Sequence, residues 1–282
     1  MYYSESDSAY AIGKVEARLG GFGDDRVAFG SILDVEKIPS GWAVLDGLNN
    51  HIVLVDGDLN SPRIVGGPGE GPGEFQAPGQ LAMVGDTIAV LEMGSGGRIS
   101  YLAPQGGFLR RSGHVGHPVR SIGIHPELGR FFPILSRDYY LVRATEEAQW
   151  PIAPVPAAFV PEIKGSADAA GMTPNLVAVT GDGTTHVFDG EHLALVSYDA
   201  SDDTGGRIAF LPREMRDRKL KETAEAATGF GGSEVRLSQW VTMLDPLDDG
   251  RIFMRAAHGT SQGYVLDPGS LTATPIVVAS DH

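Results

Sequence analysis

The feature that most constrains this sequence is a repeated group of short segments rich in β-branched and aromatic residues. One group reads as four short strands with Gly or Asp at the connections, at residues 80–84, 87–92, 98–103 and 108–111. The same order recurs from residue 121, from residue 175 and from residue 240, and a related set around 41–47 and 51–57 precedes it. Each unit spans about 40 to 50 residues, as expected for a meander that must stack on its neighbours to bury its faces.

Five consecutive meanders predict an all-β fold, namely a β-propeller of four-stranded antiparallel blades. Composition agrees, because 38 glycines and 18 prolines without a collagen period favour frequent turns and few long helices. We expect one domain over residues 1–282. Residues 15–19 resemble an outermost strand, and we expect this strand to complete the last blade, although residues 274–279 already provide that blade with a fourth strand.

Charge and hydropathy exclude several classes of partner. A formal net charge of −14 disfavours binding to nucleic acid or to anionic membranes, and no apolar run approaches the roughly 18 residues of a membrane span. We therefore expect a soluble, acidic protein. The absence of cysteine excludes disulfides and thiol chemistry. The polar residues 1–10 show no signal peptide, which fits a cytoplasmic protein, or a secreted or periplasmic one whose signal was removed.

The most specific motif lies in residues 66–111. A Gly-rich turn, GGPGEGPGEF, is followed by strands, by Arg98-Ile99 and by Gly107-Phe108. This pattern resembles the NHL-repeat family and the related bacterial six-bladed propellers. The resemblance implies six blades, whereas the sequence shows five clear repeats, and it favours a binding role. The glycines lack the G-x-G-x-x-G spacing of a dinucleotide loop and no helix follows them, so the motif does not predict a nucleotide site.

Two long connections mark the face of the propeller on which a site is expected. Connections from an outer strand to the next first strand lie on the same face as the turns between second and third strands, and we call this the upper face. The connections at 156–174 and 211–237 both belong to it, and long connections in a compact domain are usually functional or disordered. The second one predicts a helix over 212–228 that begins at Pro212. This helix is either a lid over a ligand or a solvated cover.

Polar residues open the first strand of each blade and should line the mouth of the channel on the upper face. They are Asp34, Gln80, Arg120, Asn175 and Gln239, with His117 near Arg120 and Trp240 after Gln239. The turns between second and third strands add His51, Glu92, Arg137, Asp138, His192 and His258 to this face. A water-filled propeller channel is also polar without any ligand, so both readings stay open.

Two functions follow from this arrangement. The first is binding of a small molecule, peptide or protein, with Asp34, Gln80, Asn175, Gln239, Trp240 and His258 as ligand-binding residues. The alternative is a lyase- or cyclase-type enzyme acting on a small molecule or peptide, with His117 as acid or base and Arg120 holding an anionic group. A divalent cation such as calcium or magnesium is compatible with either, but the sequence identifies no set of metal ligands.

Overall fold

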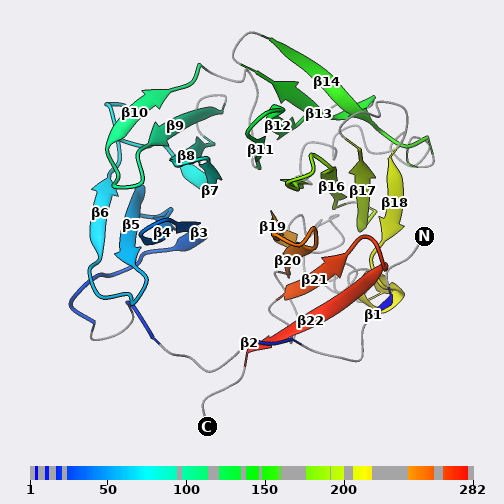
Figure 1. Cartoon of the computed structure of the whole chain (residues 1–282), viewed down its shortest axis with the longest axis horizontal. Helices are drawn as coiled ribbons and strands as arrows, with labels where there is room; N and C mark the ends of the chain where they lie inside the picture. The colour runs from blue at the N-terminus through cyan, green and yellow to red at the C-terminus, as the bar shows by residue number, and fades with distance from the viewer. Residues whose placement is uncertain are drawn as a thin grey trace, which may run out of the picture. The chain divides into compact units, whose positions relative to one another are not determined.

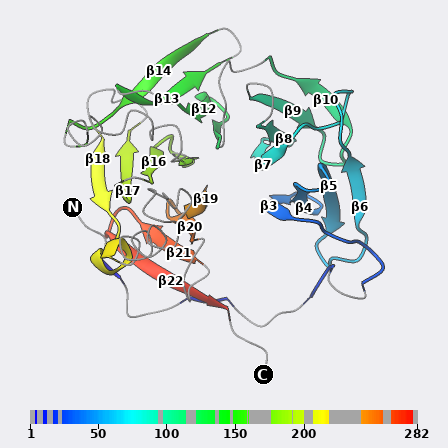
Figure 2. The ribbon, with the colours of Figure 1, turned by 180° about the vertical axis from the view of Figure 1, so that it is seen from behind.

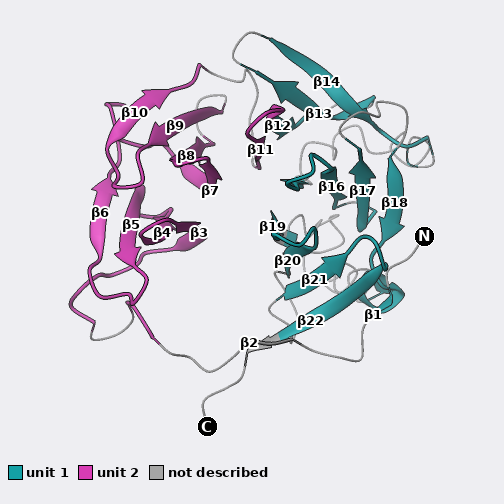
Figure 3. Cartoon of the chain, viewed as in Figure 1, with its two compact units in different colours: residues 1–14, 131–282 teal, residues 15–130 magenta. Residues whose placement is uncertain are grey.

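The computed structural model describes residues 4–5, 10–12, 17–20, 24–93, 97–113, 121–134, 138–145, 148–157, 159, 176–190, 192–199, 206–217, 241–256 and 263–278. The chain divides into two compact units, residues 1–14 with 131–282 and residues 15–130 (Figure 3). Each unit is described by itself below, and the expectation of a single domain stays a prediction. In the described part of the chain, no helix is long and apolar enough to cross a membrane.

The strands form five four-stranded sheets, one for each repeat, as blades of a β-propeller (Figure 1). The first two sheets contain β3 (Ile32–Ile38), β4 (Gly41–Asp46), β5 (His51–Asp56) and β6 (Arg63–Gly66), then β7 (Pro78–Val84), β8 (Thr87–Glu92), β9 (Arg98–Leu102) and β10 (Phe108–Arg111). The third contains β11 (Gly123–His125), β12 (Gly129–Pro133), β13 (Tyr139–Ala144) and β14 (Gln149–Pro154). The described residues hold no sixth sheet.

The last two sheets belong to the unit that includes the N-terminal residues. The fourth contains β15 (Leu176–Val179), β16 (Thr185–Asp189), β17 (Ala194–Tyr198) and β18 (Arg207–Phe210). The fifth contains β19 (Val241–Pro246), β20 (Ile252–Ala256), β21 (Gly263–Asp267) and β22 (Thr272–Val278). The order in every sheet follows the chain, so the predicted meanders are confirmed.

Both faces of the central strands of the first sheet, β4 and β5, are buried, which explains the uninterrupted apolar run in β5. Leu45 and Ile52 belong to a cluster that includes Phe75, Leu81 and other apolar residues of the second sheet. On the opposite face, a second cluster joins valines of β4 and β5 to Val27, with Leu19 and Phe29 packed against it. A continuous apolar run is the expected pattern for a strand that is covered on both sides.

Residues 17–19, the described part of the predicted closing strand at 15–19, do not form a strand. Two short strands closer to the N-terminus, β1 (Ser4–Glu5) and β2 (Tyr10–Ile12), pair with β22 instead, and both pairings are parallel. The described residues 17–20 contain no strand, because Leu19 packs against the buried valines of the first sheet. The N-terminal segment therefore does extend the last sheet, but through different residues.

The helix predicted over 212–228 is described only at its start. Residues 213–217 are helical, and the Pro212 carbonyl accepts hydrogen bonds from the N–H groups of Met215 (3.0 Å) and Arg216 (3.2 Å). Met215 is fully buried in the core shared by the fourth and fifth sheets. Residues 218–228 lie outside the described residues, so the predicted length of the helix is not tested.

Candidate functional site

Asp34, one of the predicted channel residues, contacts the next sheet. It is 5% exposed, and its Oδ2 accepts a hydrogen bond from Leu81 N on β7 at 2.7 Å, while Oδ1 accepts from Val35 N at 2.8 Å. Glu36 lies two residues further along β3 and accepts a hydrogen bond from Met83 N of the same neighbouring strand. These carboxylates thus satisfy N–H groups on the edge of β7. Any ligand role of Asp34 stays a prediction.

Gln80 makes the equivalent connection to the third sheet. Its Oε1 accepts a hydrogen bond from Ile122 N at 2.8 Å, and its Nε2 donates to Ile122 O at 3.3 Å. Ile122 directly precedes β11, and Gln80 lies on β7. The Gln80 amide thus binds both the N–H and the C=O of Ile122, as a neighbouring strand would, and fixes the position of the two segments relative to each other. The described contacts of Gln80 are therefore structural.

We expect Gln80→Ala to lower the free energy of unfolding by about 1–3 kcal/mol, because it leaves the Ile122 N–H and C=O without their side-chain partner. Gln80→Glu keeps an acceptor for the N–H and loses the donor, so a smaller loss is expected. Urea unfolding of both variants at pH 7 measures the difference. A Gln80→Ala protein as stable as the wild type would mean that the amide contributes nothing to the joint and is available for a ligand.

A buried carboxylate ends the second strand in three of the sheets. The first example is Asp46, whose carboxylate accepts hydrogen bonds from Gly30 N (2.7 Å), Ser31 N (3.0 Å) and Asn49 Nδ2 (2.8 Å). Burial alone would raise the pKa of Asp46, but these donors hold it below its ordinary value. The carboxylate thereby attaches the chain that enters the sheet to the turn between β4 and β5.

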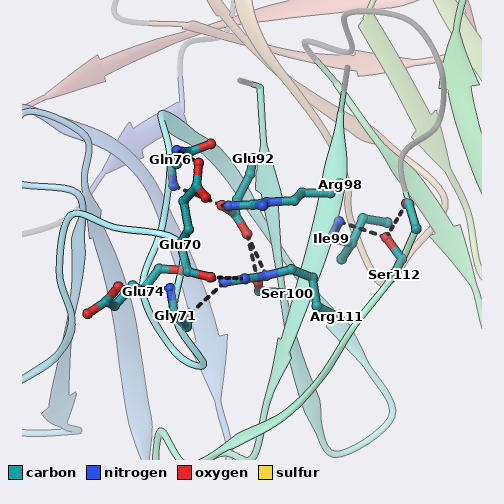
Figure 4. Close-up of polar contacts among 11 residues, drawn as sticks. Glu70, Gly71, Glu74, Gln76, Glu92, Arg98, Ile99, Ser100, Arg111 and Ser112 are labelled. Atoms are coloured by element: carbon teal, nitrogen blue, oxygen red, sulfur yellow. Dashed lines mark hydrogen bonds and ion pairs between the residues drawn. The ribbon is translucent and has the colours of Figure 1, made fainter. Parts of the chain in front are cut away.

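Glu92 occupies the same position in the second sheet and is fully buried. Its Oε2 accepts hydrogen bonds from Gln76 N (2.8 Å), Arg98 Nε (3.1 Å) and Arg98 Nη2 (2.9 Å), and its Oε1 accepts from Ser100 Oγ (2.6 Å). Figure 4 shows these groups converging on one carboxylate. Arg111 Nε lies 3.4 Å from Oε1, so a single carboxylate faces two guanidinium groups.

Arg111 connects this carboxylate to the Gly-rich turn. Its Nη1 donates to Glu70 O (2.8 Å), and its Nη2 donates to Gly71 O (3.0 Å) and Glu74 O (2.6 Å), as Figure 4 shows. Inside the turn, Gly69 has a φ of +155°, and a Cβ there would lie 2.0 Å from Glu74 Oε2. The Gly-rich motif on which the family resemblance depends therefore has a structural role: its carbonyl groups bind Arg111, which in turn contacts Glu92.

The fourth sheet provides the third carboxylate, Asp189, and combines it with groups suited to chemistry. Asp189 Oδ2 accepts a hydrogen bond from Tyr140 Oη at 2.7 Å and lies 3.1 Å from His192 Nδ1, and Oδ1 accepts from His192 N at 2.9 Å. Burial would raise the pKa of Asp189, but the hydrogen bonds and charge of His192 and the Tyr140 hydroxyl hold it below its ordinary value. The result is an ionised carboxylate that orients an imidazole.

Both long connections of the sequence begin at the turn that carries this imidazole. Phe159, from the first connection, stacks on the His192 ring with 4.1 Å between centroids and 4° between planes, and it meets Phe210 edge-on at 5.9 Å. At the start of the second connection, Leu211 N donates to Leu193 O at 2.9 Å, and the Arg216 guanidinium lies 4.7 Å from the Phe210 ring centroid. The candidate site is thus the turn between β16 and β17.

Most of the residues predicted from the sequence to form a site lie outside the described residues. These are His117, Arg120, Asn175, Gln239, Trp240 and His258, so their roles stay predictions. His192 was expected on the upper face from its position in a turn, but its partners Tyr140 and Phe159 were not expected, because no local pattern links them to it. Among the described residues, no group of three or more His, Asp or Glu side chains could hold a metal ion.

Comparison with known proteins supports the fold. No protein-family model matches the chain, and no curated protein matches it by sequence. Among solved structures, it is similar to a predicted exported protein from Bacteroides fragilis (TM-score 0.58, 11% identity, 89% of this chain and 72% of that one). It is also similar to virginiamycin B lyase from Staphylococcus aureus (TM-score 0.53, 11% identity, 88% of this chain and 70% of that one). A chain of the nidogen/laminin complex is similar as well (TM-score 0.55, 10% identity, 87% of this chain and 80% of that one). At these identities the likeness shows the fold alone, and the chain is a β-propeller protein.

Proposed function

We propose that this protein is a ligand- or partner-binding propeller whose site lies over the turn between β16 and β17. The observation that carries the proposal is that both long connections begin at the turn between β16 and β17, the first through Phe159, which stacks on the His192 ring, and the second through Leu211, whose N–H binds the Leu193 carbonyl. Long connections in a compact domain commonly form binding loops, and rigid sheets position them. The ligand is a small molecule, a peptide or a segment of another protein.

The chemistry of the site supports a ligand that combines apolar and polar groups. Phe159 stacks on the His192 ring and meets Phe210 edge-on, and the Arg216 guanidinium lies over the Phe210 ring. The Asp189 carboxylate contacts both His192 and the Tyr140 hydroxyl. Binding sites are typically apolar walls with a few fixed polar groups. A similar propeller, an inactive histidine-to-alanine variant of virginiamycin B lyase, has been solved with quinupristin (TM-score 0.52, 11% identity).

A fragment screen tests this proposal without a known ligand. The protein carries eight histidines, and labelling them with ¹³C at Cε1 gives one NMR signal for each. We expect fragments that bind to shift the His192 signal, and we expect Phe159→Ala to weaken those fragments by threefold or more, since an aromatic stack contributes about 0.5–1.5 kcal/mol. Trp150→Ala, at a half-exposed ring on β14, is the matched control. Fragments that shift only other histidines would contradict the proposal.

The second candidate function is acid–base catalysis of the lyase type. It is favoured by the contact between Asp189 Oδ2 and His192 Nδ1, because a carboxylate at one ring nitrogen fixes the tautomer of an imidazole and leaves the other nitrogen to exchange protons. That nitrogen, Nε2, is buried, so this function requires the covering segments to open for a substrate. In an elimination, such a base takes a proton from carbon and returns it to the leaving group. The sequence-based pair His117 and Arg120 is the competing assignment for the same chemistry.

Quinupristin is the first substrate to try, and liquid chromatography with mass spectrometry detects any product. If the Asp189–His192 pair acts, His192→Gln and Asp189→Asn should each reduce turnover at least a hundredfold. If His117 acts, His117→Ala should abolish turnover and the other two variants should retain it. If the wild type does not turn over quinupristin, lyase activity on this compound is excluded and binding remains the supported function.

A further inference from the structure

The fifth sheet has more strands than a blade requires. Its own four strands, β19 to β22, are complete, and β1 and β2 add to the outer edge of β22 (Figures 1 and 2). Ser4 and Glu5 pair with Thr272 and Ala273, and β2 pairs with the last three residues of β22. Ser4 also donates two hydrogen bonds to Leu271 O, from N at 2.9 Å and from Oγ at 3.3 Å. We call β1 and β2 the N-terminal arm.

The arm covers a strand edge that is otherwise suited to strand addition. On one side β22 forms five antiparallel residue pairs with β21, and its other side carries only the arm among the described strands. An open edge presents N–H and C=O groups in the spacing that another extended chain requires. Pro275 has no N–H to offer, and the two strands of the arm pair on either side of it.

The arm is held more weakly than the strands of the sheet itself. Its contacts are two residue pairs at β1 and three at β2, both in parallel orientation, whereas all the strands paired within this sheet's own meander are antiparallel. Parallel pairing is slightly less stable per residue, and two very short strands lack the cooperativity of one long strand. The arm can therefore leave without removing a strand that the sheet needs.

We infer that the outer edge of β22 is a strand-addition site for an extended peptide from another molecule, and that the arm is its intramolecular competitor. The partner would pair in parallel with Ile276–Val278, in the register that Tyr10–Ile12 has on this strand. A tethered competitor acts at an effective concentration in the millimolar range, so the intact chain should bind such a peptide weakly. Displacement or removal of the arm would expose the site.

Removal of residues 1–13 tests the inference. The probe is a fluorescein-labelled peptide with the sequence of residues 1–13, and fluorescence anisotropy measures its binding to the truncated and intact chains. We expect the truncated chain to bind the peptide at least tenfold more tightly. A control peptide with Ala11→Pro and Ile12→Pro should not bind, because one of two adjacent N–H groups must face β22. Hydrogen exchange should show that the wild-type peptide protects residue 277, whose N–H lies on the same side of β22 as the Leu271 carbonyl that accepts from Ser4 N.

A truncated chain with an unchanged far-UV circular dichroism spectrum that binds no peptide would overturn the inference, as would equal binding of the proline peptide. If truncation prevents folding, the full-length chain with Ala11→Pro and Ile12→Pro provides the second test, since it keeps every residue and releases only the arm. Tighter peptide binding by this variant than by the wild type would support the inference. Failure of both variants to fold would show that the arm is an integral strand and would also overturn it.

Discussion

Glu92→Ala should lower the free energy of unfolding by about 3–5 kcal/mol, the largest effect that we expect from any single substitution in this protein. Glu92 is fully buried and is the only described carboxylate that contacts two guanidinium groups, those of Arg98 and Arg111. Its removal leaves both positive charges without their counter-ion and takes the acceptor away from Gln76 N and Ser100 Oγ. An unpaired buried charge is costlier than the lost attraction alone.

The loss should extend to the Gly-rich turn, because Arg111 holds the carbonyl groups of Glu70, Gly71 and Glu74 only while Glu92 and Ser100 orient its guanidinium. Hydrogen exchange of residues 69–75 should accelerate in Glu92→Ala. Guanidinium chloride unfolding at pH 7 measures the stability change. Glu70→Ala is the matched control: its exposed side chain accepts a hydrogen bond from Gln76 Nε2, and a loss below about 1 kcal/mol is expected for a contact at the surface. Equal losses in the two variants would refute the role given to Glu92.

The strands could be predicted from the sequence because they depend on local pattern. Runs such as the apolar core of β5 and the turns with Gly or Asp specify a strand and its ends within a few residues, so all five meanders were found. The closing strand was misplaced in its described part, because residues 17–19 resemble a strand by local pattern, whereas Leu19 packs against a cluster of valines from the first sheet and β1 and β2 pair with β22 instead. A contact between distant segments decided that outcome.

The polar sites were less predictable for the same reason. Gln80 was expected to bind a ligand because it is polar at the start of a first strand, and this role stays a prediction; the pairing of its amide with Ile122, 42 residues away, was not expected. His192 was placed on the correct type of turn, while its partners Tyr140 and Phe159 come from the preceding sheet and the connection that follows it. A repeated signal was present in the sequence, since Asp46, Glu92 and Asp189 all end a second strand. Their partners differ from sheet to sheet and could not be read from that repeat.

Glu36→Gln should stabilise the protein above neutral pH. Burial, together with the charge of Asp34, raises the pKa of Glu36 from 4.5 to about 7, against the opposing hydrogen bond from Met83 N. The folded state therefore keeps the Glu36 proton up to about pH 7, whereas an unfolded chain releases it near pH 4.5. The contribution of this group to stability is fully present below about pH 4.5 and is lost as the pH rises through about 7. Ionised Glu36 then costs about 3 kcal/mol.

Urea unfolding of the wild type and Glu36→Gln from pH 4 to pH 9 measures this cost, because the difference between the two proteins cancels the titration of every other group. We expect the variant to gain stability relative to the wild type across pH 4.5–7 and to remain about 3 kcal/mol more stable at pH 8. The neighbouring segment of β7 has no titratable side chain, so Asp34 is the charge that faces Glu36 from its own strand. A difference for Glu36→Gln that does not change with pH would mean that Glu36 is hydrated in solution and that the connection between β3 and β7 depends on Asp34 alone.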